Sequence, residues 1–475
     1  MRKLLFILLL VLVVSCDKPD DASLQINKSS QMSLELASLL ISSTKDSITE
    51  SEAINIAKLS TLLRNTNTKS AELREVENVI EISNDAGETA MYAVNYKNKQ
   101  GYTLISATKN FYPILAEVAT GQFNDDIYKT GVSVLVDGYI AGISHVKTLP
   151  ADSVAKFRTM WKIYEKQVVP NVATTKLNEF DTFLTNQLHE WAETSHDFYP
   201  LSEAQSMLPE SVYLSFCAAA EGMSNPEYDY MTYAFVVETI DRYEYNPNNY
   251  LITTQWDQLE PYNHSCEYLG YGRYDTLGCG AVAMGQIMKY YQWPTLSWSW
   301  NDMPDKLNGS TDGETPLSQF LYSIALKIQE EGEPLNSSNT YNVYRSLCND
   351  YGYSCSIINH SQSRVITSIQ NSRPVFMRGR MPNETYGHAW ICDGYGLEQQ
   401  RVVYTLYVIA ASNTLEYVTA CDPYCDEVLS LGYYFHMNWG WGGTDDGWFI
   451  DGPYTTSVNG YTVDRKDIVD IRKNN

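Results

Sequence analysis

The sequence has no surplus of positive charge and, beyond its first residues, no long apolar run. Its 475 residues carry 34 lysines and arginines against 57 aspartates and glutamates, a formal net charge of −23. An acidic balance on this scale excludes nucleic acid as a partner, because it repels phosphate groups. It is typical of a protein kept soluble outside the cytoplasm. After the N-terminal run, no stretch is long and apolar enough to cross a bilayer.

Histidine is also scarce. The seven histidines are scattered, and none stands in a CxxC or HxxxH frame, so the sequence predicts neither a metal site nor a cofactor. Apolar and aromatic residues, at 44% and 12%, are sufficient for real cores and exclude a globally disordered chain. The length favours two or three domains.

The chain begins with Arg2 and Lys3, and an apolar run follows that ends at Cys16. This run is too short to span a membrane and fits a signal peptide. Its end resembles the lipobox of bacterial lipoproteins, which implies cleavage before Cys16 and lipidation of its thiol. A conventional signal peptide with a chance cysteine is the alternative. We predict a lipoprotein signal peptide over residues 1–16 and a flexible tether over 17–47.

One of the nine cysteines lies in this lipobox-like segment. Export permits disulfides, and Cys348 with Cys355 or Cys421 with Cys425 could pair locally. If Cys279 stays free, seven cysteines remain and at least one more must be unpaired.

The first part of the chain alternates between helical and hairpin patterns. Thr49 and Glu52 form a capping box that predicts a helix. Period-two alternation then predicts two hairpin strands over 91–96 and 102–107. Helical spacing returns over residues 151–195.

Residues 224–250 are rich in Asn, Pro and Tyr, and we predict an irregular connector there that includes a processing region. Beyond residue 250 the pattern predicts a helix after Cys279 and then strands in series, each bounded by Gly, Asn or Asp. This order predicts an α+β class. A helical half would carry the cysteine, an antiparallel sheet half would carry histidines, and a cleft would lie between them.

Cys279 stands between Gly278 and Gly280 where this helix is predicted to begin. Unpaired N–H groups and the helix macrodipole favour a thiolate at such a position. Because a free cysteine titrates near about 8.5, an imidazolium partner is also needed. The two glycines would let a substrate backbone approach the sulfur. The segment therefore predicts a nucleophile, with a buried helix cysteine as the alternative.

Two histidines could serve as the base. His388 follows Gly387 at the start of a strand, from which its side chain can reach a cleft. His436 shares a strand face with Asn438, so alternation alone does not exclude it. The amide of Gln258, a short way upstream of the cysteine, could donate to an oxyanion.

Four motifs carry a family resemblance. WDQLEPYN, GCGAVAMGQIMKYYQWP, GHAWICDGY and NWGWGG followed by DGWF, in this order, resemble those of the streptopain-like cysteine peptidases, secreted bacterial relatives of papain. The likeness covers residues 250–475, and residues 90–123 are similar to the prosegment that keeps such zymogens inactive. The resemblance implies a papain-like fold of two subdomains, helical and antiparallel β, behind an α+β prosegment.

By this resemblance Cys279 is the nucleophile, His388 the general base and acid, and Gln258 the oxyanion donor. Trp439 and Trp441 would lie against the histidine and enclose its ring.

Gly387 would bind the substrate backbone, and Asn438 sits where a papain-like orienting amide would be sought. The chain departs from the family at Tyr386, where a glycine is common, and at residues 397–432, which we interpret as a longer strand pair with a Cys421–Cys425 loop.

We therefore predict an inhibitory prosegment over residues 48–150, a helical connector and maturation region over 151–245, and a cysteine peptidase domain over 246–475. The expected protein is a cell-envelope lipoprotein of a bacterium, made as a zymogen. It would hydrolyse peptide bonds of proteins or peptides through a thioester on Cys279, with its prosegment as intramolecular inhibitor. The alternative is a catalytically silent surface lipoprotein that binds peptide or glycan through its Tyr- and Trp-rich face.

Overall fold

The structure, a computed structural model, describes most of the chain. The described residues are 45–65, 74–124, 131–161, 164, 196–201, 205, 208, 210–222, 230–243, 250–307, 313–380, 387–410, 418–420 and 424–474, apart from positions 272, 296, 298, 453, 456, 459, 460 and 463. The predicted signal peptide with Cys16, the tether up to residue 44, Tyr386 and Cys421 lie outside this part.

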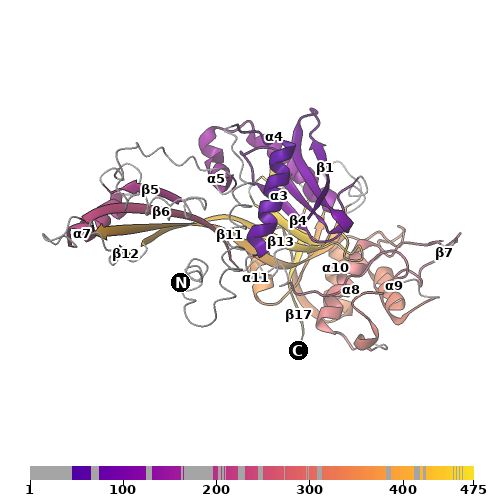
Figure 1. Ribbon diagram of the computed structural model, residues 1–475. Helices are drawn as coiled ribbons and strands as arrows, with labels where there is room; N and C mark the ends of the chain where they lie inside the picture. The colour runs from indigo at the N-terminus through magenta and orange to yellow at the C-terminus, as the bar shows by residue number, and fades with distance from the viewer. Residues whose placement is uncertain are drawn as a thin grey trace, which may run out of the picture.

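One antiparallel sheet runs through the whole molecule (Figure 1). Along its main path the strands are β1 (Val76–Ser83), β2 (Thr89–Tyr96), β3 (Tyr102–Ser106), β4 (Ile114–Val118), β14 (Gly447–Asp451), β13 (Tyr424–Asn438), β11 (His388–Ala410), β10 (Val375–Gly379), β17 (Lys466–Lys473) and β9 (Tyr353–Asn359). Together with the helices this sheet confirms the predicted α+β class.

Helices pack beside the sheet in two groups. The N-terminal group is α3 (Glu50–Asn65), α4 (Val132–Val146) and α5 (Ala151–Trp161), and the C-terminal group is α8 (Cys279–Tyr291), α9 (Pro316–Ile328), α10 (Thr340–Arg345) and α11 (Gln362–Gln370). Shorter elements are β7 (Tyr268–Gly270), β8 (Arg273–Tyr274), β15 (Ser457–Val458), β16 (Tyr461–Thr462), two 3₁₀ turns (Lys97–Lys99 and Trp300–Asp302) and a π turn (Ser346–Asp350). In the part of the chain described, no helix has the length and apolarity required to cross a membrane.

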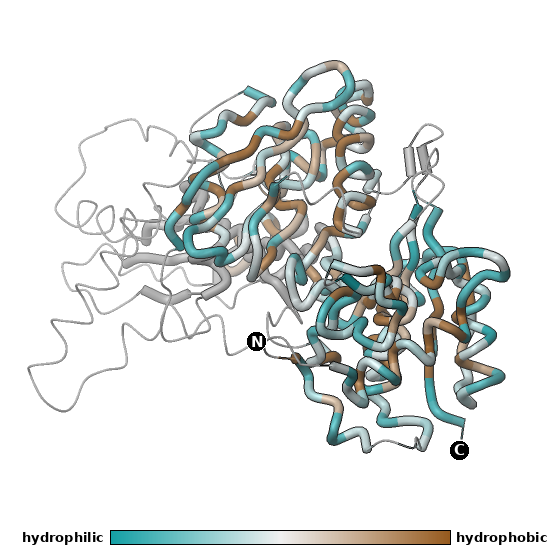
Figure 2. Tube along the Cα trace, turned by 90° about the vertical axis from the view of Figure 1, so that its right-hand side faces the viewer, coloured by the Kyte–Doolittle hydropathy of each residue, from teal (hydrophilic) through white to brown (hydrophobic). Residues whose placement is uncertain are grey.

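Apolar side chains form two clusters. Figure 2 shows hydrophobic stretches, in brown, in both the N-terminal and the C-terminal parts of the described chain. One cluster joins the N-terminal elements to sheet residues such as Met437 and Phe449. The other joins α8 and α9 to residues such as Ile391 and Ile468. The N-terminal region therefore shares a core with the sheet rather than folding apart from it.

The predicted helix at Thr49 and the predicted hairpin are confirmed. Of the helical pattern predicted over residues 151–195, α5 covers 151–161, and the residues after 164 lie outside the described part. Thr49 and Glu52 exchange the two hydrogen bonds of a capping box, at 2.8 and 3.3 Å, at the start of α3. Strands β2 and β3 pair as an antiparallel hairpin, with Met91 opposite Ser106 and Asn95 opposite Tyr102.

The N-terminal strands are joined to the C-terminal strands through β4 and β14. Val118, Glu117 and Ala116 of β4 pair with Gly447, Trp448 and Phe449 of β14.

Two tyrosines reinforce this junction. The Tyr139 hydroxyl of α4 donates to the Ile450 carbonyl at 2.8 Å, and the Tyr434 hydroxyl donates to the Ile114 carbonyl at 2.9 Å. Bonds therefore cross the junction in both directions.

The long strand pair predicted between the histidine and tryptophan motifs is present as β11 and β13, whose register runs from Ile391 and Asn438 to Tyr404 and Tyr424. With β5 (His196–Pro200), β6 (Tyr230–Tyr243), β12 (Val418–Ala420) and α7 (Glu210–Gly222), these strands form an arm that projects from the body (Figure 1).

The prediction of an irregular connector over residues 224–250 is wrong for β6. This strand pairs with β11 from Tyr243 opposite Leu397 to Tyr230 opposite Ala410. Its Asn- and Pro-rich flanks suggested a loop, whereas its interior is rich in the β-branched and aromatic residues that favour strands.

Helix α8 begins at Cys279, as predicted, and positions that residue at one end of the sheet. All residues of this helix from Gly280 to Met288 are buried. The helix is enclosed on several sides because it packs against both α9 and β11.

Candidate active site

Cys279 occupies the first turn of α8, preceded by Gly278 as N-cap with φ 86°. A Cβ on Gly278 would lie 2.8 Å from Asn336 Cα, and one on Gly280 would lie 2.5 Å from Ser338 Oγ. The glycines therefore admit this chain's own loop beside the helix start. Their role in admitting a substrate backbone stays a prediction.

The start of β11 brings His388 to this cysteine. Burial by itself raises the pKa of the Cys279 thiol, but the charge and hydrogen bond of His388 and the N–H of Ala389, 3.2 Å from the sulfur, bring this pKa below its usual value. Burial by itself lowers the pKa of His388, but the charge and hydrogen bond of Cys279 and the Trp439 carbonyl raise it. The two shifts together favour an imidazolium–thiolate pair.

A backbone carbonyl orients the histidine. His388 Nε2 lies 3.0 Å from the Trp439 carbonyl oxygen, which can only accept a hydrogen bond. Nε2 therefore carries a proton, and Nδ1 is the ring nitrogen left for the sulfur.

Asn438 does not have the orienting contact expected of it. Its Nδ2 donates to the Thr254 carbonyl at 2.9 Å, and its Oδ1 accepts from Gln286 Nε2 at 3.0 Å and from the Gly440 N–H at 3.2 Å. Among the described residues its hydrogen bonds thus tie α8 to the segment around Thr254, and the contact that orients His388 comes from the neighbouring carbonyl.

Tryptophans surround the His388 ring. Trp441 and Trp390 are each within 10° of parallel to it, with ring centroids 6.1 and 6.4 Å away, and Trp439 is tilted at 6.3 Å. Trp439 and Trp441 were expected to wall the histidine, and the structure places both beside it. Trp390 was missed, although it lies two residues after His388 on the same strand face.

Gln258 has an unused donor near the cysteine. Its side chain is 5% exposed, and its Nε2 is buried and has no hydrogen-bond partner among the described residues. The Asp257 carboxylate accepts the Gln258 N–H at 2.6 Å, and the Gln258 carbonyl accepts the N–H of Leu277 at 3.3 Å. Because Leu277 precedes Cys279 by two residues, the amide is tied to the start of α8.

His436, the rival base, is engaged elsewhere. Its Nδ1 lies 2.6 Å from the carboxylate of buried Asp393, and its ring stacks on Tyr250 with centroids 4.2 Å apart. The Asp393 carboxylate and carbonyl accept the N–H groups of Ile252 and Leu251. His436 therefore fastens the segment at residues 250–252 to the sheet.

Asp446 was not predicted. Its carboxylate accepts the Trp439 N–H at 2.8 Å, on the residue whose carbonyl holds His388. Burial raises the pKa of Asp446 to about 7, although this hydrogen bond opposes the shift. The sequence signal was the acidic pair Asp445 and Asp446, whose second member begins the DGWF motif.

Gly387 has a packing role in the structure. A Cβ there would lie 2.5 Å from the Gly379 carbonyl oxygen, so glycine allows β11 to begin close against β10. A contact with substrate backbone stays a prediction.

Helix α4 reaches the site from the N-terminal region. A Cβ on Gly131, its N-cap, would lie 2.1 Å from His388 Cδ2 and 2.7 Å from Trp439 Cε3. The positive end of this helix therefore abuts the candidate base.

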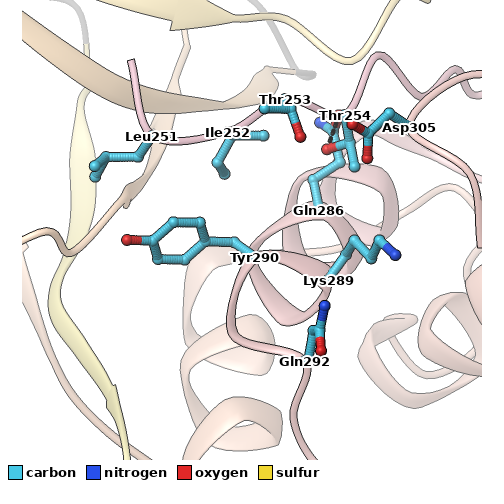
Figure 3. Close-up of a pocket in the computed structure, with 9 residues that line it drawn as sticks. All are labelled: Leu251, Ile252, Thr253, Thr254, Gln286, Lys289, Tyr290, Gln292 and Asp305. Atoms are coloured by element: carbon cyan, nitrogen blue, oxygen red, sulfur yellow. Dashed lines mark hydrogen bonds between the residues drawn. The ribbon is translucent and has the colours of Figure 1, made fainter. Parts of the chain in front are cut away.

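A separate pocket of ≈ 230 Å³ lies behind α8 (Figure 3). Its lining is mostly polar and includes Thr254, Gln286, Lys289 and Asp305. Neither Cys279 nor His388 lines it, so it is distinct from the candidate site.

Comparison with known proteins follows the same division of the chain. Residues 256–449 match the peptidase C10 family, and residues 45–142 match the Spi protease inhibitor family.

Two curated relatives match at low identity. The thiol protease/hemagglutinin PrtT of Porphyromonas gingivalis is 24% identical over 260 residues, which is 46% of this chain and 26% of that protein. Streptopain of Streptococcus pyogenes serotype M28 is 22% identical over 245 residues, which is 43% of this chain and 51% of that protein. The chain thus matches a quarter to a half of these relatives' lengths.

Two solved structures, both from Prevotella intermedia, are also similar. A prointerpain A fragment aligns over 83% of this chain and 98% of its own, with 14% identity and a TM-score of 0.41. Active interpain A aligns over 47% of this chain and 97% of its own, with 16% identity and a TM-score of 0.30.

Proposed function

This chain belongs to the streptopain-like cysteine peptidases of the C10 family, and from that premise we propose that it is a cysteine endopeptidase made as a zymogen. The peptidase domain would span residues 246–475, the inhibitory prosegment 48–150, and the connector with the maturation site 151–245. Its substrates would be proteins or peptides, with the prosegment as an intramolecular inhibitor.

In the proposed reaction the Cys279 thiolate attacks the carbonyl carbon of a peptide bond. The Gln258 amide and the backbone N–H at the start of α8 stabilise the resulting oxyanion. His388 gives its Nδ1 proton to the leaving amine, and a thioester remains on the sulfur. A water molecule then attacks the thioester and gives a proton to His388. The C–S bond breaks, which releases the carboxylic acid product and restores the Cys279 thiolate beside the imidazolium.

The observation that carries this proposal is the meeting of three groups: a thiol of lowered pKa, an imidazole held by a carbonyl, and a buried amide donor without a partner. An irreversible epoxide directed at papain-like enzymes tests it. Peptide mapping should find the label on Cys279 of the processed protein, with complete loss of peptidase activity. Label on another cysteine, or full activity after labelling of Cys279, would refute the assignment.

Gln258→Ala tests the oxyanion donor. Loss of one such donor is expected to lower kcat by about 10²–10³-fold. Alkylation of Cys279 by iodoacetamide should change little, because displacement of iodide develops no negative charge on an oxygen. Gln370→Ala, an exposed glutamine on α11, is the control and should match the wild type in both assays. Equal loss of turnover and alkylation would assign Gln258 a structural role instead.

Latency is proposed to arise from α4. Its N-cap fills the space beside His388, and the macrodipole at that end disfavours a cation on the ring. Substrate would thus meet both a steric block and a weakened ion pair until the N-terminal region departs.

Gly131→Ala is expected to loosen this block, since its Cβ cannot fit 2.1 Å from His388 Cδ2. Epoxide labelling of Cys279 in the unprocessed chain should accelerate about tenfold or more, as a steric conflict of 1–3 kcal/mol shifts the docking equilibrium. Asp85→Ala is the control, because that side chain is exposed in a turn of the same region. Unchanged labelling of the Gly131 variant would remove α4 as the block.

We further propose that lipid on Cys16 tethers the exported protein to the bacterial cell envelope. Cells fed labelled palmitate should incorporate label into the wild type and into Cys279→Ala, but not into Cys16→Ser. Absence of label in all three, or an intact Met1 on the cell-associated protein, would contradict the anchor.

A further inference from the structure

An apolar hairpin stands out from the surface beside the candidate site. Strands β7 and β8 pair through Tyr268 opposite Tyr274 and Gly270 opposite Arg273. Leu269 is 55% exposed and Tyr271 is 99% exposed. In Figure 1, β7 lies at the edge of the molecule opposite the long arm.

The turn presents its aromatic residue at a conformational cost. Tyr271, the first residue after the Gly270–Arg273 pair, has a positive φ of 55°, which the first central residue of a tight hairpin turn adopts. Positive φ is uncommon for a bulky residue other than glycine. The side chain at the tip is thus held outward instead of folding back on the body.

The base of the hairpin is fixed to the candidate catalytic groups. The Leu277 N–H donates to the Gln258 carbonyl, and the Asp275 N–H donates to the Glu267 carbonyl at 2.8 Å. One strand therefore leads back toward the oxyanion donor, and the other leads to Cys279. Leu259, beside Gln258, extends the exposed apolar surface to this base.

The N-terminal region leaves this surface uncovered. Leu269 and Tyr271 are exposed with α4 and the N-terminal strands in place. The inhibitory contact and the hairpin thus occupy different parts of the peptidase surface. A protruding ridge also differs from the concave shape that suits a small ligand.

We propose that the β7–β8 hairpin is a docking surface for an extended apolar or aromatic segment of a protein substrate, outside the bonds that react. The proposal rests on the proposed peptidase function. A two-stranded hairpin offers backbone groups to an added strand, and its large apolar side chains offer contact area. The acidity of the chain favours this occupant over an anionic lipid surface.

The test compares two substrates of the processed enzyme, a short fluorogenic peptide and unfolded casein. For the double variant Leu269→Ser and Tyr271→Ser, kcat/KM on casein should fall about tenfold through KM, as expected for two lost apolar contacts. The peptide should be cleaved at the wild-type rate, because it does not reach the hairpin. The matched controls are Leu326→Ser and Tyr341→Ser, on α9 and α10, with exposures of 51% and 62%.

A second readout does not require catalysis. Casein binding to the full-length Cys279→Ala chain should weaken about tenfold when the hairpin carries both serines, because the hairpin is uncovered in that form. An equal loss of kcat/KM on the peptide and on casein would mean that the hairpin only positions Gln258, and it would overturn the proposal. No loss in cleavage or in binding also overturns it, as does wild-type binding to anionic vesicles but not to casein. An inactive wild type that still shows hairpin-dependent binding would overturn the peptidase and keep the docking surface.

Discussion

Replacing His388 by alanine should abolish turnover, with a loss of kcat/KM of about 10⁴-fold or more. His388 brings the pKa of Cys279 below its usual value, and Cys279 raises the pKa of His388. The thiolate–imidazolium pair is therefore favoured at pH values between these two pKa values. Without the imidazole, burial leaves the thiol protonated. Epoxide labelling at pH 6, where a free thiol is mostly unionised, should therefore slow about 100-fold. At alkaline pH, where the thiol can ionise without the imidazole, the difference should shrink.

His436→Ala is the matched comparison. It removes the partner of buried Asp393 and the ring under Tyr250, so it should lower stability by about 3 kcal/mol. The remaining folded protein should label normally at pH 6. His436→Asn, which preserves a donor, should recover part of the stability. If the His436 variants lose reactivity while His388→Ala retains it, the assignment of the base is reversed and Cys279 stays the nucleophile.

The second large effect concerns maturation. Cys279→Ala expressed alone should accumulate as the uncut chain, whereas the wild type should shorten to a fragment close to residues 245–475. The structure gives a physical limit for the cut, because Leu251 and Ile252 are bonded to Asp393 in the sheet. N-terminal sequencing of the product and gel analysis of both proteins provide the measurement.

Cys348→Ala serves as the control for that experiment and should be processed normally, since this cysteine lies in the π turn away from His388. Processing of Cys279→Ala at the wild-type rate would show that another protease performs the cut. A mature fragment that begins before Tyr230 would retain β6 on β11 and would place the maturation site further upstream.

The site could be predicted from the sequence to the extent that its chemistry is local. The roles of a cysteine at the start of an apolar helix and of a histidine at the start of a strand can be predicted from the residues next to them in the sequence. The role of the Trp439 carbonyl could not be predicted in this way, because every residue has a carbonyl and only the fold determines which one contacts His388. Asn438 was the more conspicuous candidate in the sequence, yet its amide donates to the Thr254 carbonyl and not to His388.

The fold shows the same limit. The capping box at Thr49 and the β2–β3 hairpin depend on residues close in sequence, and both are confirmed. Strand β6 depends on β11, which lies far along the chain, so its Asn- and Pro-rich flanks dominated the local pattern. The contact of Gly131 with His388 could not be predicted either, because it requires two distant regions to share one sheet.

The sheet shared by the N-terminal region and the C-terminal strands also affects how the chain associates with other chains. While β4 is in place, β14 is an interior strand, with Trp448 and Phe449 buried. When the N-terminal region leaves, the same strand becomes an open edge with unpaired N–H and C=O groups, the kind of edge along which proteins aggregate. We therefore expect the proposed release of the N-terminal region to unblock His388, by removing α4, and to expose an aggregation-prone edge, by removing β4, in the same step.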